Sequence, residues 1–238
     1  MFSSCAYLNL DKIEVKPEEA SFVQTEEAGS YKVQRSIGYN KDKDFISKTL
    51  ITDMEKPDVV VEKSVTFSEV YELNKDSKIF RPIKSEAIYF LNGQKYVTKL
   101  ALDYKKEIVR ITMDSPEDQW NGTKEYSMPK GNGAICFYSI VTECAVVSSF
   151  FENAVKNNSG TMNFILVWEG YPYFHEQFLN LPPTPITEAT ISYDGRNSAG
   201  FYRFTLNAGG QSQFYFINKN GQLVNHYWSS QAYTRVRR

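Results

Sequence analysis

The sequence predicts a mainly β (α+β) protein in which a large curled antiparallel sheet, or unclosed barrel, wraps one central helix. Many short segments alternate in polarity with a period of two, which is typical of half-buried strands. One apolar block over about Ala134–Asn157 interrupts them, and alternating segments resume after it. A helix that is apolar on most sides must be covered on several faces, and a curled sheet is the simplest cover.

Composition bounds the size and the partners. With 238 residues, of which 42% are hydrophobic, the chain can bury one large core. Basic and acidic side chains number 27 and 28, so no extended positive field exists and we expect no nucleic-acid partner. Residues 1–29 are polar and acidic and predict an N-terminal tether, followed by a single curled domain over residues 30–238.

Period-two patterning defines the first strands. Tyr31, Val33, Ile37 and Tyr39 share one face of the first one, while Lys32, Gln34 and Ser36 share the other. Asn92-Gly93 predicts a tight hairpin turn. The further strands predicted before the apolar block are Phe45–Asp53, Val59–Leu73, Ile79–Leu91, Gln94–Tyr104 and Ile108–Met113.

The stretch with Pro129, Gly131 and Gly133 ends this meander and admits a helix over Ala134–Asn157. A helical hairpin or two strands are the alternatives, because the block is rich in β-branched and aromatic residues. The strands predicted after it are Met162–Trp168, Tyr171–Phe178, Ala189–Tyr193, Phe201–Leu206, Gln213–Asn218, Gln222–Trp228 and a basic end at Thr234–Arg238.

The three cysteines form no metal motif, so we expect neither a structural metal nor a cofactor. Cys136 and Cys144 fall two turns apart on the predicted helix. Since the α-carbons of a disulfide lie within about 7 Å, we expect these two to be buried apolar residues rather than a disulfide.

Cys5 lies in a different context. The segment Phe2-Ser3-Ser4-Cys5-Ala6 is similar to the end of a bacterial lipoprotein signal, in which the cysteine is acylated, although Phe2 departs from the pattern and no charged and apolar stretch precedes it. The similarity implies a lipid anchor in the bacterial periplasm or outer membrane. If Met1 is the true start, we expect a cytoplasmic protein in which Cys5 is a plain thiol. No apolar run is long enough to predict a transmembrane helix.

The order of strands, the mid-chain apolar block and the late segments Ile191–Gly195 and Phe216–Leu223 resemble bacterial envelope proteins related to the lipoprotein carriers LolA and LolB, including an uncharacterised periplasmic family. The resemblance covers roughly Tyr31–Trp228. It implies an unclosed barrel whose concave apolar face shelters acyl chains or another lipophilic ligand. The chain departs from the carriers in its length and in the late position of the block.

We therefore predict a non-catalytic envelope protein that binds a lipophilic small molecule, a lipid, or an acylated or glycan-bearing partner on the concave face. The alternative is that the same aromatic residues fill the core and leave no cavity. The predicted lining consists of Trp168, Tyr202, Phe204, Phe214, Phe216, Tyr227 and Trp228.

Two other classes of function remain open. The chain has no GxSxG, HExxH or phosphate-binding loop, but Tyr173 and His175 would share one strand face, and with Arg203 they are the residue types that a polysaccharide lyase uses. Convergence of these three in an open cleft would favour such an enzyme. A solid concave face with an apolar patch elsewhere would favour a structural protein-interaction module. The basic end is expected to be a solvated tail, with a contact to membrane headgroups as the alternative.

Overall fold

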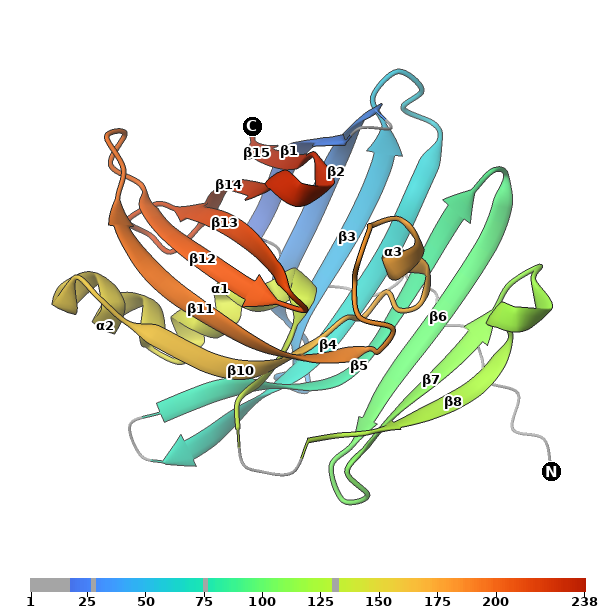
Figure 1. Cartoon of the computed structure of the whole chain (residues 1–238), viewed down its shortest axis with the longest axis horizontal. Helices are drawn as coiled ribbons and strands as arrows, with labels where there is room; N and C mark the ends of the chain where they lie inside the picture. Colours follow the sequence, from blue (N-terminus) through green and yellow to red (C-terminus); the bar gives the residue numbers. More distant parts are fainter. Residues whose placement is uncertain (1–17, 27–28, 75–76, 130–132) are drawn as a thin grey trace.

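A computed structural model describes residues 18–26, 29–74, 77–129 and 133–238. Their strands form one 15-stranded sheet that curls on itself without closing (Figure 1). The predicted fold class, a large curled sheet that is mainly β, is confirmed. None of the described helices has the length and apolar character needed to cross a membrane.

Most strands agree with the alternating segments of the sequence, whereas those over Glu18–Glu26 and Gly122–Ser127 were not predicted. Those before the apolar block are β1 (Glu18–Glu26), β2 (Gly29–Tyr39), β3 (Phe45–Asp53), β4 (Val60–Asn74), β5 (Ser77–Leu91), β6 (Gln94–Asp103), β7 (Ile108–Asp114) and β8 (Gly122–Ser127). Those within and after it are β9 (Ile135–Phe137), β10 (Thr161–Val167), β11 (Ile186–Arg196), β12 (Tyr202–Ala208), β13 (Gln211–Ile217), β14 (Leu223–Trp228) and β15 (Tyr233–Arg237).

Two meanders build the sheet. Strands β1 to β8 pair antiparallel in chain order, as do β10 to β15, and β9 adds parallel to β10. The meanders join where β1 pairs with β15, with Val23 opposite Val236. The edges are therefore β8 and β9, which are consecutive strands of the chain, and α1 (Val141–Val147) and α2 (Phe150–Asn157) lie between β9 and β10.

Strand β1 corrects the predicted tether over residues 1–29. Phe22 of β1 is buried between Val33 and Arg237 of the neighbouring strands, so residues 18–26 belong to the sheet. The acidic composition of this segment concealed its alternation. Residues 1–17, including Cys5, lie outside the described residues.

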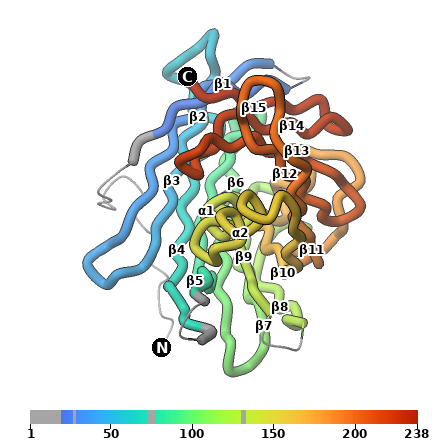
Figure 2. The backbone as a smooth tube through the Cα atoms, turned by 90° about the vertical axis from the view of Figure 1, so that its left-hand side faces the viewer, coloured from blue at the N-terminus to red at the C-terminus, as the bar shows by residue number. Residues whose placement is uncertain are grey.

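The predicted helix over Ala134–Asn157 is divided. After β9, a 3-10 turn at Tyr138–Ile140 leads into α1 (Val141–Val147), and Ser149, with φ 60°, separates α1 from α2 (Phe150–Asn157). A left-handed residue cannot continue a right-handed helix. Helix α1 packs against β5 and β9, and α2 packs against β11 (Figure 2).

This division also corrects the prediction for the cysteines. Cys136 lies on β9 and Cys144 on α1, and because the chain reverses between them their α-carbons are 6.4 Å apart and the two form a disulfide. The argument against a disulfide assumed one continuous helix, in which two turns separate the α-carbons. The disulfide fastens α1 to the strand that precedes it.

The predicted strand Tyr171–Phe178 is instead a turn with a cis Tyr171–Pro172 bond, followed by the short helix α3 (Tyr173–Glu176). Pro172 has no N–H for a sheet ladder, and the Phe174 N–H donates to the Gly170 carbonyl at 2.9 Å, as in a helix. A Cβ at position 170 would overlap the Tyr89 hydroxyl, so the close approach of this turn to β5 requires glycine.

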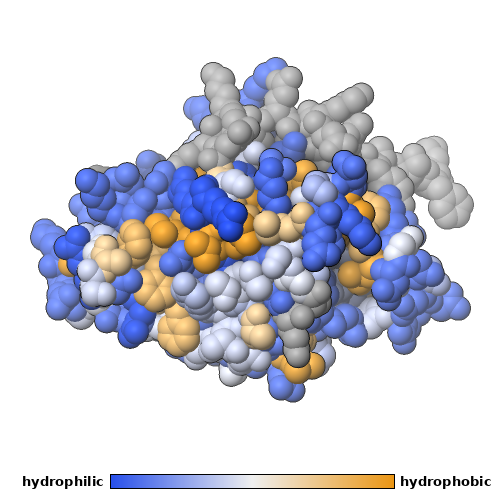
Figure 3. All heavy atoms as spheres, turned by 90° about the horizontal axis from the view of Figure 1, so that it is seen from above, coloured by the Kyte–Doolittle hydropathy of each residue, from blue (hydrophilic) through white to orange (hydrophobic). Residues whose placement is uncertain are grey.

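The concavity holds a continuous core between the two meanders and the helices. Trp168 and Trp228 are fully buried and stack with their ring centroids 6.4 Å apart. On the opposite meander, Leu100 and Ile111 are likewise buried and belong to the same cluster. Seen from above, apolar side chains gather in a band across the middle of the molecule, bordered by hydrophilic ones (Figure 3).

Candidate functional site: a groove above a buried ion pair

A groove of about 260 Å³ opens between α1, strands β1 to β3 and the β13–β14 turn. Its apolar walls come from both meanders and the helix, since alternate residues of each strand face inward. These walls are formed by Phe22, Ile37, Phe45, Phe80, Val147 and Leu223.

A glycine turn and a cation also belong to the lining of the groove. In the β13–β14 turn, Gly221 has φ +77°, and a Cβ there would lie 3.1 Å from Val146 Cγ2, so a glycine lets the turn rest on α1. Arg237, opposite Phe22 on β15, places a cation among the lining residues. The basic end of the chain is thus a strand of the sheet rather than a solvated tail.

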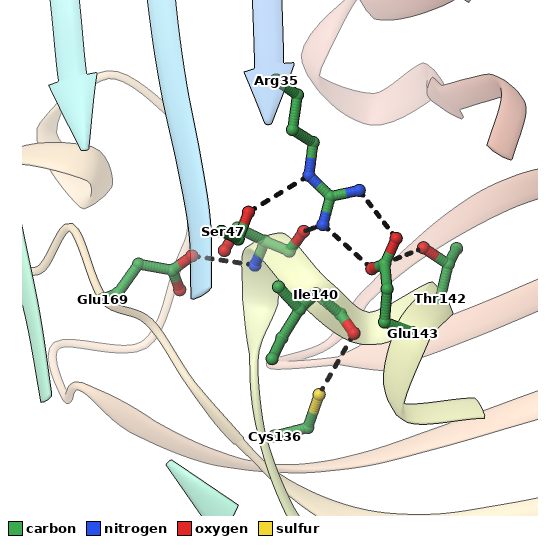
Figure 4. Close-up of polar contacts among 8 residues, drawn as sticks. Arg35, Ser47, Cys136, Ile140, Thr142, Glu143 and Glu169 are labelled. Atoms are coloured by element: carbon green, nitrogen blue, oxygen red, sulfur yellow. Dashed lines mark hydrogen bonds and ion pairs between the residues drawn. The ribbon is translucent and has the colours of Figure 1, made fainter. Parts of the chain in front are cut away.

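The floor of the groove is an ion pair between β2 and α1. Arg35 donates from Nη1 to Glu143 Oε1 at 2.8 Å and from Nη2 to Glu143 Oε2 at 2.9 Å, and these bonds are drawn in Figure 4. Arg35 Nη2 also donates to the Ser139 carbonyl at 2.9 Å, and its Nε donates to Ser47 Oγ at 3.3 Å. Thr142 Oγ1 donates to Glu143 at 3.0 Å. A planar guanidinium matches a carboxylate in this two-bond arrangement.

Both members of the pair stay charged. Burial alone would raise the pKa of Glu143, but the charge and hydrogen bonds of Arg35 outweigh burial and lower it below its usual value. Burial likewise acts to lower the pKa of Arg35, and Glu143 more than reverses this effect. Since Arg35 uses all three nitrogens on protein acceptors, it supports the groove rather than offering donors to a ligand.

A second carboxylate holds the start of the 3-10 turn. Glu169 is buried and accepts the backbone N–H groups of Tyr138 at 3.1 Å and Ser139 at 2.8 Å. Burial raises its pKa despite these bonds. Arg35 therefore hydrogen-bonds to the carbonyl of Ser139 in this turn, while Glu169 accepts hydrogen bonds from two of its N–H groups. Together these bonds orient α1.

Below the ion pair lies a smaller cavity of about 60 Å³, which Arg35 also lines. Glu62 of β4 reaches it, accepts a hydrogen bond from Ser64 Oγ at 2.7 Å, and has its pKa raised to about 7 by burial. Arg235 also lines the cavity, and its Nη2 donates to Gln24 Oε1 at 2.8 Å. A volume of this size is enough for about two water molecules, at about 30 Å³ each.

The polar cluster continues along β13 and β14. His226 Nε2 lies 2.9 Å from Gln213 Oε1, to which Tyr138 also donates at 2.9 Å. Burial lowers the pKa of His226 well below its usual value, so the ring is neutral. The cluster therefore presents hydrogen-bonding groups and no histidine charge to the interior.

The seven residues predicted to line a cavity divide into two sets. Trp168, Phe204 and Trp228 are fully buried in the core, and Tyr202 contacts Phe151 of α2. Phe214, Phe216 and Tyr227 lie on the other side of the sheet, where they border a separate shallow depression. None of the seven lines the groove above the ion pair.

The three residues of the alternative enzymatic hypothesis are not brought together. Tyr173 is buried inside the curl and donates to the Trp120 carbonyl at 3.1 Å. Arg203 points outward from β12 and pairs with Asp194. His175 packs edge-on against Trp168, and burial lowers its pKa to about 4. In addition, the described residues contain no group of three His, Cys, Asp or Glu side chains that could hold a metal ion.

The ion pair was missed at the level of the sequence, although one signal was present. Arg35 occupies an inward position of β2 between Val33 and Ile37, so it is a charge within an otherwise apolar row. Such a residue needs a buried partner. The partner, Glu143, is 108 positions away, and no local pattern identifies it.

Comparisons with known proteins bear on the fold. No family model matches the sequence, and no curated protein is significantly similar to it. The structure is similar to the crystal structure of a β-barrel-like protein of DUF1849, a domain of unknown function, from Brucella abortus. The TM-score is 0.54 at 9% identity, over 95% of this chain and 96% of the other. The likeness shows the fold alone.

Proposed function

We propose that this protein is a non-catalytic binding protein that takes a single-chain anionic amphiphile, such as a fatty acid or the acyl chain of a lipid, into the groove beside α1. The apolar tail lies between α1 and the inward residues of β1 to β3, and the anionic group pairs with Arg237. The groove itself, with apolar walls and with Arg237 among its lining residues besides the Arg35–Glu143 pair, is the observation that supports the proposal.

The size of the groove limits how much of an acyl chain is buried, and therefore how tightly the chain binds. At roughly 30 Å³ for a water-sized group, 260 Å³ takes about eight or nine heavy atoms. At about 0.8 kcal/mol per buried methylene, a dissociation constant below about 10 µM is not expected. The entropic cost of association weakens binding further, toward a dissociation constant of about 1 mM.

We further propose that the protein works in an oxidising compartment, the periplasm or outer membrane of a bacterium. Disulfides persist in such compartments and are rare in the cytosol. The Cys136–Cys144 disulfide supports this location, and it also holds α1, the wall of the groove, in place. The resemblance to the envelope lipoprotein carriers, and the lipid anchor at Cys5, belong to the same proposal.

Calorimetric titration with dodecanoate and with dodecanol tests the function. Ala20 faces the groove and Ser21 faces the opposite side of β1, so Ala20→Trp should fill the groove and abolish binding, while Ser21→Trp should not. Arg237→Gln should weaken the binding of dodecanoate by about two- to fivefold and leave the binding of dodecanol unchanged, because only dodecanoate carries a charge. Equal binding by the two tryptophan variants would contradict the proposal.

A further inference from the structure

A second surface lies on the outer side of the sheet, away from the groove. Phe214 and Phe216 of β13 and Tyr227 of β14 are half-buried there and border a depression of about 390 Å³, together with Asn197, Arg203 and Asn225. We call these six residues the aromatic platform. Their neighbours Tyr215 and His226 point to the interior and are buried, so the platform residues face outward.

The register of the strands arranges the platform as two rows. Thr205, Phe214 and Tyr227 lie opposite one another in one row. Arg203, Phe216 and Asn225 form the next row. Phe216 and Tyr227 meet edge to face across the rows, with their centroids 5.6 Å apart. Three aromatic rings thus form the floor of the depression, with polar side chains beside them.

The polar side chains leave hydrogen-bonding capacity unused. Asn225 Oδ1 is buried and accepts no hydrogen bond from any described residue. A buried acceptor without a donor costs free energy, which a ligand hydroxyl would recover. Arg203 is held by Asp194 through Nε at 3.2 Å, and Asp194 also accepts from Thr205 Oγ1 at 2.5 Å. This holds the guanidinium at the border of the platform.

We propose that the aromatic platform binds a glycan. A pyranose ring has one face of C–H groups, which suits the electron-rich face of an aromatic ring, and a rim of hydroxyls that both donate and accept hydrogen bonds. The aromatic floor matches the first feature. For the second, the guanidinium of Arg203 supplies donors and Asn225 Oδ1 supplies an acceptor.

Other ligands fit this surface less well. An acyl chain would leave the Asn225 acceptor without a donor, and a nucleic acid would need more positive charge than one arginine that is already paired. A peptide that extends a sheet needs a free strand edge, whereas β13 is paired on both sides.

A glycan array tests the proposal. The array carries bacterial and host polysaccharide fragments and is probed with the full chain, and calorimetry with the best-bound oligosaccharide follows. We expect binding in the millimolar range or tighter. Phe216→Ala and Tyr227→Ala should each weaken it by about tenfold or more, because each removes a stacking surface. Phe90→Ala removes an aromatic side chain of 37% exposure from β5 and should leave binding within about twofold.

Circular dichroism and thermal melting establish that each variant is folded, as expected for half-buried positions. Three results would overturn the proposal: no glycan on the array retained by the wild-type protein, binding that survives both platform substitutions, or self-association of the wild-type protein that Phe216→Ala abolishes. The last result would assign the platform to a second copy of this chain. Since the groove is unchanged in these variants, dodecanoate binding should persist in them.

Discussion

Replacing Glu62 with glutamine should stabilise the protein at pH 8 and have little effect at pH 5. In the folded protein, burial raises the pKa of Glu62 to about 7, from 4.5 for an ordinary glutamate. The folded state therefore binds the proton more tightly than the unfolded chain does. Stability contributed by this group is fully present below pH 4.5 and is lost as the pH rises to about 7, after which the loss is constant.

The magnitude follows from the shift. At about 1.36 kcal/mol per pH unit, the ionised carboxylate costs about 3 kcal/mol at pH 8 and less than about 1 kcal/mol at pH 5. Glutamine is neutral at both values, and its oxygen can still accept the bond from Ser64 Oγ. The gain in the free energy of unfolding should therefore be about 2 kcal/mol larger at pH 8 than at pH 5.

Urea denaturation of the wild-type protein and of Glu62→Gln, at pH 5 and at pH 8, measures this difference. Glu152→Gln, at an exposed position of α2, serves as the control for loss of a carboxylate. Because the comparison is between variants at one pH, other groups that titrate cancel. A gain that is the same at pH 5 and pH 8, or a loss at pH 8, would refute the burial of Glu62 beside the inner cavity.

Two further predictions concern the segment that carries α1. Replacing both Cys136 and Cys144 with serine should lower the free energy of unfolding by about 2–3 kcal/mol, because the disulfide closes a short loop. The melting temperature should fall by about 5–10 °C. An unchanged melting temperature would contradict the presence of the disulfide. In urea denaturation, Glu143→Ala should lower the free energy of unfolding by about 3 kcal/mol or more, because it leaves Arg35 buried without its carboxylate partner. The control Glu125→Ala, which breaks an exposed pair with Arg110, should lower it by less than about 1 kcal/mol. Similar losses of stability in the Glu143→Ala and Glu125→Ala variants would mean that the ion pair of Arg35 is solvated.

The sequence predicted the sheet well because the sheet depends on a local, period-two pattern. Strand β3 was predicted to the residue, and β5, β6 and β7 within two residues at each end. The pattern failed where other effects dominate. Pro172 and the close contact of Gly170 with Tyr89 produce a turn and a helix in a segment that alternates like a strand.

The candidate site was far less predictable, because its parts meet only through contacts between segments that are distant in the chain. The pairing of β1 with β15 brings Phe22 beside Arg237, and the reversal at Tyr138–Ile140 brings Glu143 to Arg35. Both are contacts between distant parts of the chain. The abundance of aromatic residues led to the prediction of a lining whose members either fill the core or face outward. The groove is instead lined mainly by smaller apolar residues together with Phe22, Phe45 and Phe80.

The central claim, that the groove beside α1 holds an acyl chain, is tested most directly by crosslinking with a fatty acid that carries a photoreactive diazirine near its tail. Peptide mapping locates the attachment site without relying on a variant. We expect the label on α1 and on the inward residues of β1 to β3, and we expect excess dodecanoate to suppress it. A label confined to the outer side of the sheet, or one that dodecanoate does not displace, would contradict the account.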